Sequence, residues 1–334
     1  MKKSSILVTG GAGYIGSHMV RLLIDEGHRV SIIDNLSTGN RKLIHPKADF
    51  IRADLRDINQ VRRAFSGRRF DTVMQFAASL IVPESVAEPL KYYENNVSAT
   101  VNLLKVMMEK RVMRLIFSST AATYGQPKRV PVRETDIGVP ASPYGQSKLV
   151  VEKVLKDLAI AEPQFRYVSL RYFNVCGAHP SGDLGPMKKK ETLLIPNVLR
   201  ALRQGPRHPL NVFGTDYPTP DGSCIRDYVH VMDLCSAHLS SLNYLWRGGK
   251  SDAFNLGNGK GYSVKEVVRA AEKLLGRKVP VKISPRRPGD PSRIIASIAK
   301  ARRVLRWRPT YDLPRILDTA WRWDQHKAGL RASG

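Results

Sequence analysis

Short β-branched and apolar runs alternate with segments of helical periodicity over the first half of the chain. The runs read ILVTG, RVSIID, DFIRAD, DTVMQFAA, RLIFSST and RYVSLRYFN, and the last of them ends at Asn174. Strands that alternate with helices in this way indicate βαβ units, whose parallel sheet is covered by helices on both faces. The pattern therefore predicts an α/β fold built on an open, doubly wound parallel sheet of the Rossmann type.

The pattern changes after Phe173. Residues 176–222 are rich in Gly, Pro and Lys, with helical periodicity only near 195–203. A strand followed by a helix is predicted over 224–245. A clear amphipathic helix follows Ser263, which with Glu266 forms a capping box, and it ends at Gly276. Two further helices are expected within 297–326.

These patterns predict two domains. The first is a nucleotide-binding domain over residues 1–175, to which a segment near 223–255 is expected to return. The second is a smaller, partly discontinuous α/β domain, formed by residues 176–222 and 256–330, that binds the substrate. A chain of 334 residues is long enough for this arrangement.

The composition is that of a soluble globular protein, with 42% hydrophobic and 7% aromatic residues. No apolar run reaches the length of about 20 residues that a membrane span needs. The first apolar stretch, Ile6 to Val8, is too short for a signal peptide. Cys176, Cys224 and Cys235 have no metal-ligand spacing, and we expect reduced, buried thiols in a cytoplasmic protein.

The net charge of +25 is the one unusual feature of the composition. It could indicate a polyanionic partner. However, the basic residues are spread along the chain, and the only run, Lys188 to Lys190, is expected to be a solvated loop. Aromatic residues are not interleaved with basic ones, and the eight histidines show no metal-binding pattern. We therefore expect no nucleic-acid partner and no metal, whereas a small anionic substrate fits the charge.

A glycine-rich loop follows the first predicted strand and precedes a helix. Gly10, Gly13 and Gly16 give G-x-x-G-x-x-G, and Gly11 with the last two gives G-x-G-x-x-G. Such glycines let backbone N–H groups approach a pyrophosphate at a helix N-terminus. Asp34 ends the second strand, where a carboxylate can accept from ribose hydroxyls and repel a 2′-phosphate. The loop therefore predicts dinucleotide binding, with NAD favoured over NADP.

A tyrosine and a lysine stand four residues apart in SPYGQSKLVVEK, at the start of a predicted helix. Tyr144 and Lys148 would share one helix face. An isolated pair of this kind is usually two surface neighbours. Here the pair follows a dinucleotide motif, and Thr120 ends the fifth strand just before this helix, at the edge of the sheet where ligands bind. We therefore interpret these three residues as a candidate catalytic group.

Nine motifs carry a resemblance to a known family. They are TGGAGYIGSH, DNLSTG, YYENNV, FSSTAATYG, SPYGQSK, LRYFNVCGAHPSG, GTDYPTPDGSCIRDYVHVMDL, FNLGNG and PRRPGDP. Together they cover essentially the whole chain, and RYFNVCGAHPSG and RDYVHVMDL are the most specific. The sequence resembles the extended short-chain dehydrogenase/reductase superfamily and, within it, the UDP-glucose 4-epimerases of the NAD-dependent epimerase/dehydratase family.

The resemblance implies an isomerase that interconverts UDP-galactose and UDP-glucose through a transient 4-keto sugar. Tyr144 would be the general base, Lys148 and bound NAD⁺ would stabilise its phenolate, and Thr120 would bridge it to the 4-hydroxyl group. Hydride would leave the sugar C4 for the nicotinamide and return to the other face. The reaction has no net redox change, so NAD should remain bound.

The resemblance also implies the contacts of both ligands. The implied cofactor-binding residues are Gly10, Gly13, Tyr14, Ile15, Gly16, Asp34, Asn35, Leu36, Ser37, Thr38, Gly39, Asp54, Leu55, Phe76, Ala77, Ala78, Leu80, Asn95, Tyr144, Lys148 and Phe173. The implied substrate-binding residues are Thr120, Tyr144, Asn174, Leu194, Asn211, Phe213, Arg226, Arg287 and Asp290. Arginine suits a UDP diphosphate because its fork binds two oxygens at once.

Alternatives within the superfamily differ in substrate or reaction. Related dehydratases carry an Asp-Glu pair after the active-site Thr, where this chain has Ala121 and Ala122. Epimerases of UDP-glucuronate, UDP-pentoses or UDP-N-acetylhexosamines stay open as alternatives. Ile294 aligns with a position that gates the N-acetyl group, and its size favours plain hexoses. Leu80 and Leu193 stand where relatives often have polar residues, which bears on affinity and specificity.

Two further expectations concern partners. A non-catalytic NAD-binding or nucleic-acid-binding protein would be expected to lack Tyr144 or Lys148, and both are present. Relatives are commonly homodimers, joined through the helix that carries Tyr144 and the long helix before it. The segments YYENNVSATVNLLKVMMEK and KLVVEKVLKDLA have enough apolar surface for such an interface.

Overall fold

The computed structural model describes residues 3–136, 138–187, 193–287 and 290–332. The predicted solvated loop at Lys188 to Lys190 lies outside these residues.

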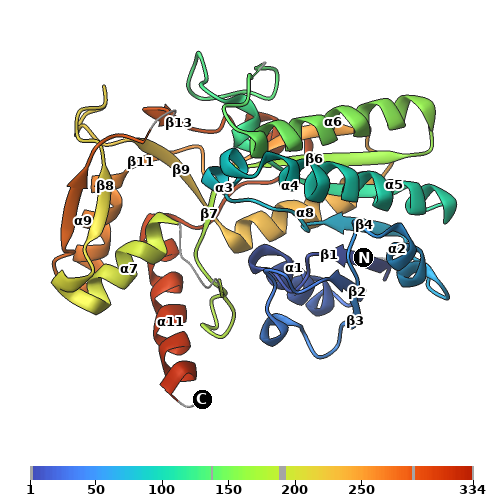
Figure 1. Ribbon diagram of the computed structural model, residues 1–334, viewed down its shortest axis with the longest axis horizontal. Helices are drawn as coiled ribbons and strands as arrows, with labels where there is room; N and C mark the ends of the chain where they lie inside the picture. The colour runs from blue at the N-terminus through green and yellow to red at the C-terminus, as the bar shows by residue number, and fades with distance from the viewer. Residues whose placement is uncertain (1–2, 137, 188–192, 288–289, 333–334) are drawn as a thin grey trace.

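Seven parallel strands form the large sheet, in the order β10-β6-β5-β4-β1-β2-β3 (Figure 1). The strands are β1 (Ser5–Thr9), β2 (Arg29–Asp34), β3 (Asp49–Arg52), β4 (Thr72–Gln75), β5 (Arg114–Thr120), β6 (Arg166–Tyr172) and β10 (Asp252–Leu256). The strand order reverses between β1 and β4, which creates a crevice at the carboxyl ends of the strands. The predicted doubly wound parallel sheet is confirmed.

Helices cover both faces of this sheet, each through an apolar stripe. One core contains residues of α2 (Ile58–Phe65), α5 (Ala99–Glu109) and α6 (Pro143–Ala161). The opposite core contains residues of α1 (Tyr14–Asp25), α8 (Val231–Trp246) and α10 (Ala299–Val304). The short helices α3 (Val82–Ala87) and α4 (Pro89–Tyr93) lead into a π-helical turn, η2 (Glu94–Ser98), and then into α5.

The second part of the fold lies at the left of Figure 1 and contains two small sheets. One sheet joins β7 (Asn174–Cys176), β9 (Ile225–His230), β11 (Gly261–Ser263) and β13 (Arg293–Ile294). The other pairs β8 (Leu210–Phe213) with β12 (Val281–Ser284). A third core holds these strands against α7 (Leu194–Gln204), α9 (Val264–Leu275) and α11 (Leu313–Ala332). The 3₁₀ turns are η1 (Arg41–Leu43), η3 (Ala121–Tyr124) and η4 (Gly205–Arg207).

Local signals predicted several element ends. The capping box at α9 is present, with the Ser263 hydroxyl accepting from Glu266 N and the Glu266 carboxylate accepting from Ser263 N. Gly276 ends the helix in the left-handed region at φ 63°. This position favours glycine because it has no Cβ.

Residues 223–255 were predicted to return to the large sheet. In the structure they are divided between the large sheet and the small sheet that contains β7. The first strand of this segment, β9, pairs with β7, β11 and β13 in the small sheet. The strand that joins the large sheet is β10, which pairs with β6. The helix between them, α8, covers the large sheet, so β10 is the strand that follows that helix back to the sheet edge. The predicted domain boundaries stay a prediction.

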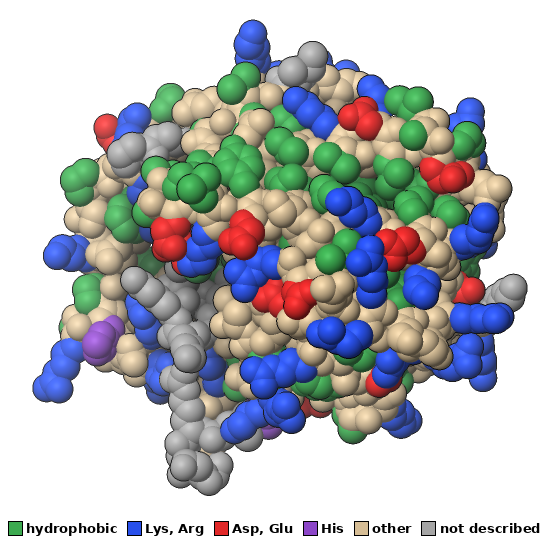
Figure 2. Space-filling view, turned by 45° about the vertical axis from the view of Figure 1, so that its right-hand side comes forward, with side chains coloured by type: hydrophobic (Ala, Val, Ile, Leu, Met, Phe, Trp, Pro, Cys, Tyr) green, Lys and Arg blue, Asp and Glu red, His purple; other side chains and the backbone are tan. Residues whose placement is uncertain are grey.

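Charges and thiols follow a simple distribution. On the face that Figure 2 shows, Lys and Arg side chains are spread widely, with Asp and Glu side chains among them. Cys176, Cys224 and Cys235 are buried and free. Within the described ranges, His, Cys, Asp and Glu form no group of three or more that could hold a metal ion. None of the helices in that part of the chain has the length and apolar character to cross a bilayer.

Candidate active site

The glycine loop joins β1 to α1 through very close backbone contacts. A Cβ added at Gly16 would lie 2.2 Å from the Gly10 carbonyl oxygen, and one at Gly10 would lie 2.6 Å from Ala77 N at the end of β4. Gly10 also has φ +73°. Among the described residues, no side chain caps the N-terminus of α1, which follows Gly13. A bare helix N-terminus behind a glycine loop fits a pyrophosphate.

Asp34 closes the other side of this loop. Its side chain lies at the carboxyl end of β2 and is 8% exposed. One carboxylate oxygen accepts from Ala12 N at 3.0 Å, and the other accepts from Leu36 N at 2.8 Å. Each oxygen keeps a second lone pair for a ribose hydroxyl. Burial raises the pKa of Asp34, while the two backbone N–H groups oppose that shift.

The loop after β2 is joined to the loop after β3 by polar contacts. Asn35 Nδ2 donates to Asp54 Oδ2 at 3.0 Å, and Asn35 Oδ1 accepts from Ser37 N at 2.9 Å. Arg56 binds the same Asp54 carboxylate at 2.8 Å and lowers its pKa to about 2. Asn35, Ser37 and Asp54 thus lie together, and their contact with a cofactor stays a prediction.

Further predicted cofactor residues lie around the carboxyl ends of β4 and β6. Phe76 packs on the His238 ring with centroids 4.9 Å apart, and Phe173 N donates to Leu256 O at 3.0 Å. Asn95 Nδ2 donates to Ser79 Oγ at 2.9 Å, which fixes the η2 turn against the loop after β4. In that loop the Leu80 side chain is 48% exposed.

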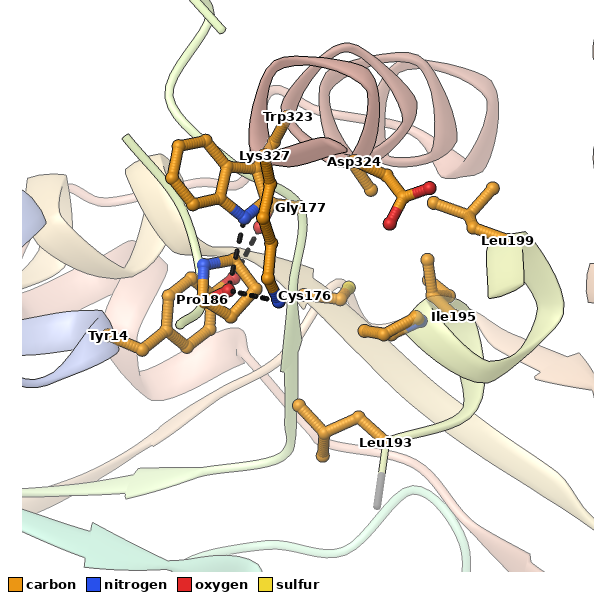
Figure 3. A pocket seen from close by; sticks show the side chains of 12 residues that line it. Tyr14, Cys176, Gly177, Pro186, Leu193, Ile195, Leu199, Trp323, Asp324 and Lys327 are labelled. Atoms are coloured by element: carbon orange, nitrogen blue, oxygen red, sulfur yellow. Dashed lines mark hydrogen bonds between the residues drawn. The ribbon is translucent and has the colours of Figure 1, made fainter. Parts of the chain in front are cut away.

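Tyr14 reaches across to the second part of the fold. Its hydroxyl donates to the Gly177 carbonyl oxygen at 2.6 Å. Figure 3 shows the cavity beside it, where Trp323 Nε1 donates to the Pro186 carbonyl oxygen at 3.1 Å. Leu193, the departure noted in the sequence, lines this cavity. Its neighbours in the lining include the apolar residues Ile195, Pro196 and Leu199.

The candidate catalytic residues meet where β5 faces the start of α6. Ser142 caps this helix, its hydroxyl accepting from Gly145 N at 3.2 Å. The Tyr144 phenol lies near the side chain of Thr120, the last residue of β5. The Thr120 hydroxyl accepts from Ala122 N at 3.1 Å, which orients it. The Tyr92 ring lies edge-on to the Tyr144 ring, with centroids 6.4 Å apart.

Lys148 follows one turn later on the same helix and also faces the end of β5. Its ammonium donates to the Ser118 carbonyl oxygen at 2.8 Å and lies 4.8 Å from the centre of the Phe117 ring. The side chain is 4% exposed, and burial lowers its pKa to about 7. Burial also raises the pKa of Tyr144, and the nearby Thr120 side chain opposes this. Low polarity thus acts against the charged form of both groups.

Five of the predicted substrate residues come from four separate segments. Arg226 Nη2 on β9 contacts Asp290 Oδ1 at 2.7 Å. The Arg287 guanidinium lies 3.9 Å from the centre of the Phe213 ring, which comes from β8. Asn174 Nδ2 on β7 donates to a carbonyl oxygen of β9, that of residue 227, at 3.1 Å. The structure therefore places two guanidinium groups beside an acid and an aromatic face.

Three other predicted positions can be located precisely. Asn211 is exposed and lies two residues before Phe213, so both side chains are on one face of β8. Leu194 is the first residue of α7 and packs against the third core. Ile294 is 8% exposed and belongs to a small core with Phe173. In β13 it is paired with Arg226, and its role as a gate stays a prediction.

Two buried acids of this region were not singled out from the sequence. Asp227 is 0% exposed and accepts backbone N–H groups from residues 258, 259 and 296 at 2.6, 3.0 and 3.0 Å. Glu152 is 9% exposed and forms an ion pair with Arg171. The sequence did carry a signal for each acid, because each stands within an apolar segment: Asp227 in DYVHV and Glu152 in LVVEKVL. Glu152 is also four residues after Lys148.

Comparisons with known proteins agree with this geometry. The sequence profile of the NAD-dependent epimerase/dehydratase family matches residues 6–257. A UDP-glucose 4-epimerase of Lacticaseibacillus casei is 47% identical over 98% of both chains. A crystal structure of a UDP-glucose 4-epimerase from Stenotrophomonas maltophila, with bound NAD and formylated UDP-arabinopyranose, has a TM-score of 0.94 and is 38% identical. It covers 98% of this chain and 99% of its own.

A second crystal structure is that of UDP-glucose 4-epimerase from Brucella ovis in complex with NAD. It is 43% identical with a TM-score of 0.91, and the match covers 95% of this chain and 97% of the other. The profile match spans more than half of the chain, and these relatives match it nearly from end to end. The chain therefore belongs to the NAD-dependent epimerase/dehydratase family.

Proposed function

We propose that this protein is an NAD-dependent isomerase that inverts C4 of a UDP-hexose and so interconverts UDP-galactose and UDP-glucose. The observation that carries the proposal is that the Tyr144 phenol lies near the Thr120 side chain, with the buried ammonium of Lys148 one helical turn away, at the carboxyl end of a dinucleotide-type sheet. Relatives named UDP-glucose 4-epimerase, 45–47% identical over nearly the whole chain, support it.

The residues of the chain provide proton transfer. Tyr144, as phenolate, takes the proton of the sugar 4-hydroxyl, and the Thr120 hydroxyl holds that oxygen in place. Lys148 lies one turn away and supplies the positive charge that the phenolate needs, because an opposite charge nearby favours the ionised form. When bound, NAD⁺ supplies the acceptor for the C4 hydride and afterwards its donor. Tyr144 then returns the proton to the inverted sugar, which leaves no net redox change.

The chain also fits the cofactor that this chemistry needs. The glycine loop leaves no space for Cβ atoms at Gly10 and Gly16, and the N-terminus of α1 favours negative charge. The buried carboxylate of Asp34 has acceptor capacity for a ribose and would repel a 2′-phosphate. These two observations favour NAD over NADP.

Binding of the UDP moiety is assigned to the second part of the fold. Arg226 and Arg287 supply two positive charges for a diphosphate, and Asp290 orients Arg226 through its ion pair. The Phe213 ring lies against Arg287 and offers an apolar surface beside it. The sugar would then extend toward Tyr144.

We infer that two copies of the chain associate through α4, α5 and α6. Leu90 on α4 is 81% exposed and Ile160 on α6 is 71% exposed, and large apolar side chains so exposed often mark an interface. Light scattering after size exclusion should give twice the chain mass. A variant that carries both Leu90→Glu and Ile160→Glu should have the mass of a single chain. A wild-type protein that stays monomeric at all concentrations would contradict the inference.

We also infer that the protein works in a reducing compartment, the cytoplasm. Cys176, Cys224 and Cys235 are all free and buried, and unpaired thiols are usual where glutathione keeps cysteines reduced.

The experiment that tests the function is incubation with UDP-galactose without added cofactor, followed by assay for UDP-glucose. Conversion should vanish in Tyr144→Phe, which removes only the hydroxyl. Tyr244→Phe is the matched control, because that hydroxyl binds the Lys250 carbonyl at the surface, far from the site. Conversion that survives in Tyr144→Phe would remove Tyr144 from its role. Absence of conversion by the wild type, even with NAD⁺ added, would refute UDP-galactose as substrate.

A further inference from the structure

A buried ion pair lies directly behind the candidate catalytic residues. The Glu152 carboxylate accepts three hydrogen bonds from Arg171: one from Nη2 at 2.6 Å and two from Nε, at 3.0 and 3.2 Å. Both side chains are largely shielded from water. The guanidinium is also bound by the Tyr124 hydroxyl at 2.8 Å and the Glu134 carbonyl oxygen at 3.1 Å. Because the desolvation of two charges offsets much of their attraction, a buried ion pair is a weak device for stability alone.

Glu152 stands in line with the catalytic residues of α6. Tyr144, Lys148 and Glu152 are spaced by four residues, so they follow one another along one face of the helix. All three face consecutive residues at the end of β5. Tyr144 lies near the Thr120 side chain, Lys148 donates to the residue 118 carbonyl oxygen, and Glu152 accepts from the Ser119 hydroxyl.

We propose that the Glu152–Arg171 ion pair is a positioning device for the base, which fixes the end of β5 against α6 and keeps Lys148 in its charged form. The proposal rests on the proposed function for its catalytic meaning, but the charge of Lys148 can be measured without turnover. Glu152 contacts neither ligand in this scheme and acts through Lys148 and Ser119.

Charge explains why the pair matters to Lys148. Burial lowers the pKa of this lysine to about 7, and Glu152 is the group that opposes the shift. Arg171 lies beyond Glu152, on β6. Several tyrosines lie nearby. Tyr92 on α4 faces the phenol of Tyr144, Tyr172 lies on β6 near the same phenol, and Tyr124 and Tyr167 lie near the ion pair. Without the carboxylate, the charge that opposes the effect of burial on Lys148 is lost, and Arg171 loses its ion-pair partner.

Glu152→Gln is the sharpest test, because the amide can still accept from Arg171 and donate to Ser119 while the charge is lost. The titration of Lys148 is followed by NMR of its ε-methylene in protein with isotope-labelled lysine, assigned by its loss in Lys148→Met. We expect the midpoint to fall by about one pH unit in Glu152→Gln. Asp157→Asn is the matched control, since Asp157 is exposed on the same helix, and it should leave the midpoint unchanged.

Kinetics gives a second readout that a purely structural role would not move. The limb of the kcat profile that falls with rising pH, assigned to Lys148 losing its proton, should move to lower pH in Glu152→Gln. KM for UDP-galactose should stay constant. An equal Lys148 midpoint in wild type and Glu152→Gln would overturn the proposal. Loss of turnover in wild type would refute only the proposed function, because the NMR titration does not depend on it.

Ser119→Ala separates positioning from charge and keeps the proposal testable if Glu152→Gln does not fold. It removes the hydrogen bond and leaves the carboxylate charged. We expect a lower kcat and an unchanged titration midpoint for Lys148. A kcat equal to that of wild type would overturn the positioning part. A midpoint that moves in Ser119→Ala as far as in Glu152→Gln would show that packing, not charge, sets the pKa.

Discussion

Replacement of Asp227 by Asn is expected to change how the stability of the protein depends on pH. The carboxylate is 0% exposed and accepts from three backbone N–H groups, at residues 258, 259 and 296. Desolvation by burial outweighs these hydrogen bonds and raises its pKa from 3.8 to about 6. The folded chain therefore binds this proton more tightly than the unfolded chain does.

The sign and size of the effect follow from proton linkage. A group whose pKa is raised on folding contributes stability that is fully present below its unfolded pKa and is lost as the pH rises through its folded pKa. With the two pKa values of Asp227, 3.8 and about 6, the protonation contribution is about 1.3 kcal/mol larger at pH 5 than at pH 7. An Asn at this position does not titrate, so the variant lacks this contribution.

Asn also changes the hydrogen bonds at this position. Its amide offers one oxygen, which can face the two N–H groups of residues 259 and 296, while its NH₂ group then faces the N–H of residue 258. The loss of that charge-assisted hydrogen bond costs about 1.5–3 kcal/mol. At pH 7 this loss is opposed by removal of the buried charge, whose desolvation outweighs its hydrogen bonds. The prediction is therefore the change between the two pH values: wild type should gain about 1.3 kcal/mol relative to the variant at pH 5.

The assay is urea unfolding followed by tryptophan fluorescence at pH 5 and pH 7, for wild type, Asp227→Asn and Asp157→Asn. The quantity compared is the difference in free energy of unfolding between wild type and each variant. For Asp157→Asn this difference should be the same at both pH values, because that residue is exposed. A difference for Asp227→Asn that is equal at both pH values, or larger at pH 7, would refute the assignment of a raised pKa to Asp227.

Three further substitutions test the site and the core. Gly16→Ala would place a Cβ 2.2 Å from the Gly10 carbonyl oxygen, so the purified variant should carry no NAD. The measurement is an assay of the NAD released when the protein is denatured, and an NAD content equal to that of a Gly329→Ala control would contradict the prediction. Arg226→Gln should raise KM for UDP-galactose by roughly tenfold or more, with a smaller effect on kcat, because a charge-assisted contact to the diphosphate is lost; an unchanged KM would remove the residue from the site. Leu155→Ala, at a 0% exposed position of α6, should lower the free energy of unfolding by about 2–5 kcal/mol in urea, and a loss below about 1 kcal/mol would mean that the core closes around the cavity.

Local sequence patterns were sufficient for much of the fold. The alternation of strands and helices predicted the parallel sheet, because hydrophobic periodicity reflects which face of an element is buried. The capping box of Ser263 and Glu266 and the glycine stop at Gly276 predicted the ends of α9 to the residue. The glycine loop, Asp34 and the spacing of Tyr144 and Lys148 could be read in the same way, since each lies within one short segment.

Positions in the second part of the fold depended on resemblance instead. Arg226 and Asp290 are 64 residues apart and meet at 2.7 Å. No spacing rule links them, and only the family motifs suggested that both contact one ligand. Their ion pair, and the contact of Arg287 with the Phe213 ring, became visible only once β8, β9 and the segment around residue 290 were placed in space.

The sequence by itself determined the order of the elements, the glycine loop and the face of α6 that carries Tyr144 and Lys148, because these depend on neighbours within a few residues. Only the tertiary structure decided that β10 rather than β9 extends the large sheet, and that Glu152 pairs with Arg171 from β6. It also decided the electrostatics of the site. The pKa of Lys148 is lowered because the surrounding elements exclude water from it, and exclusion of water is a property of packed segments that no single stretch of sequence contains.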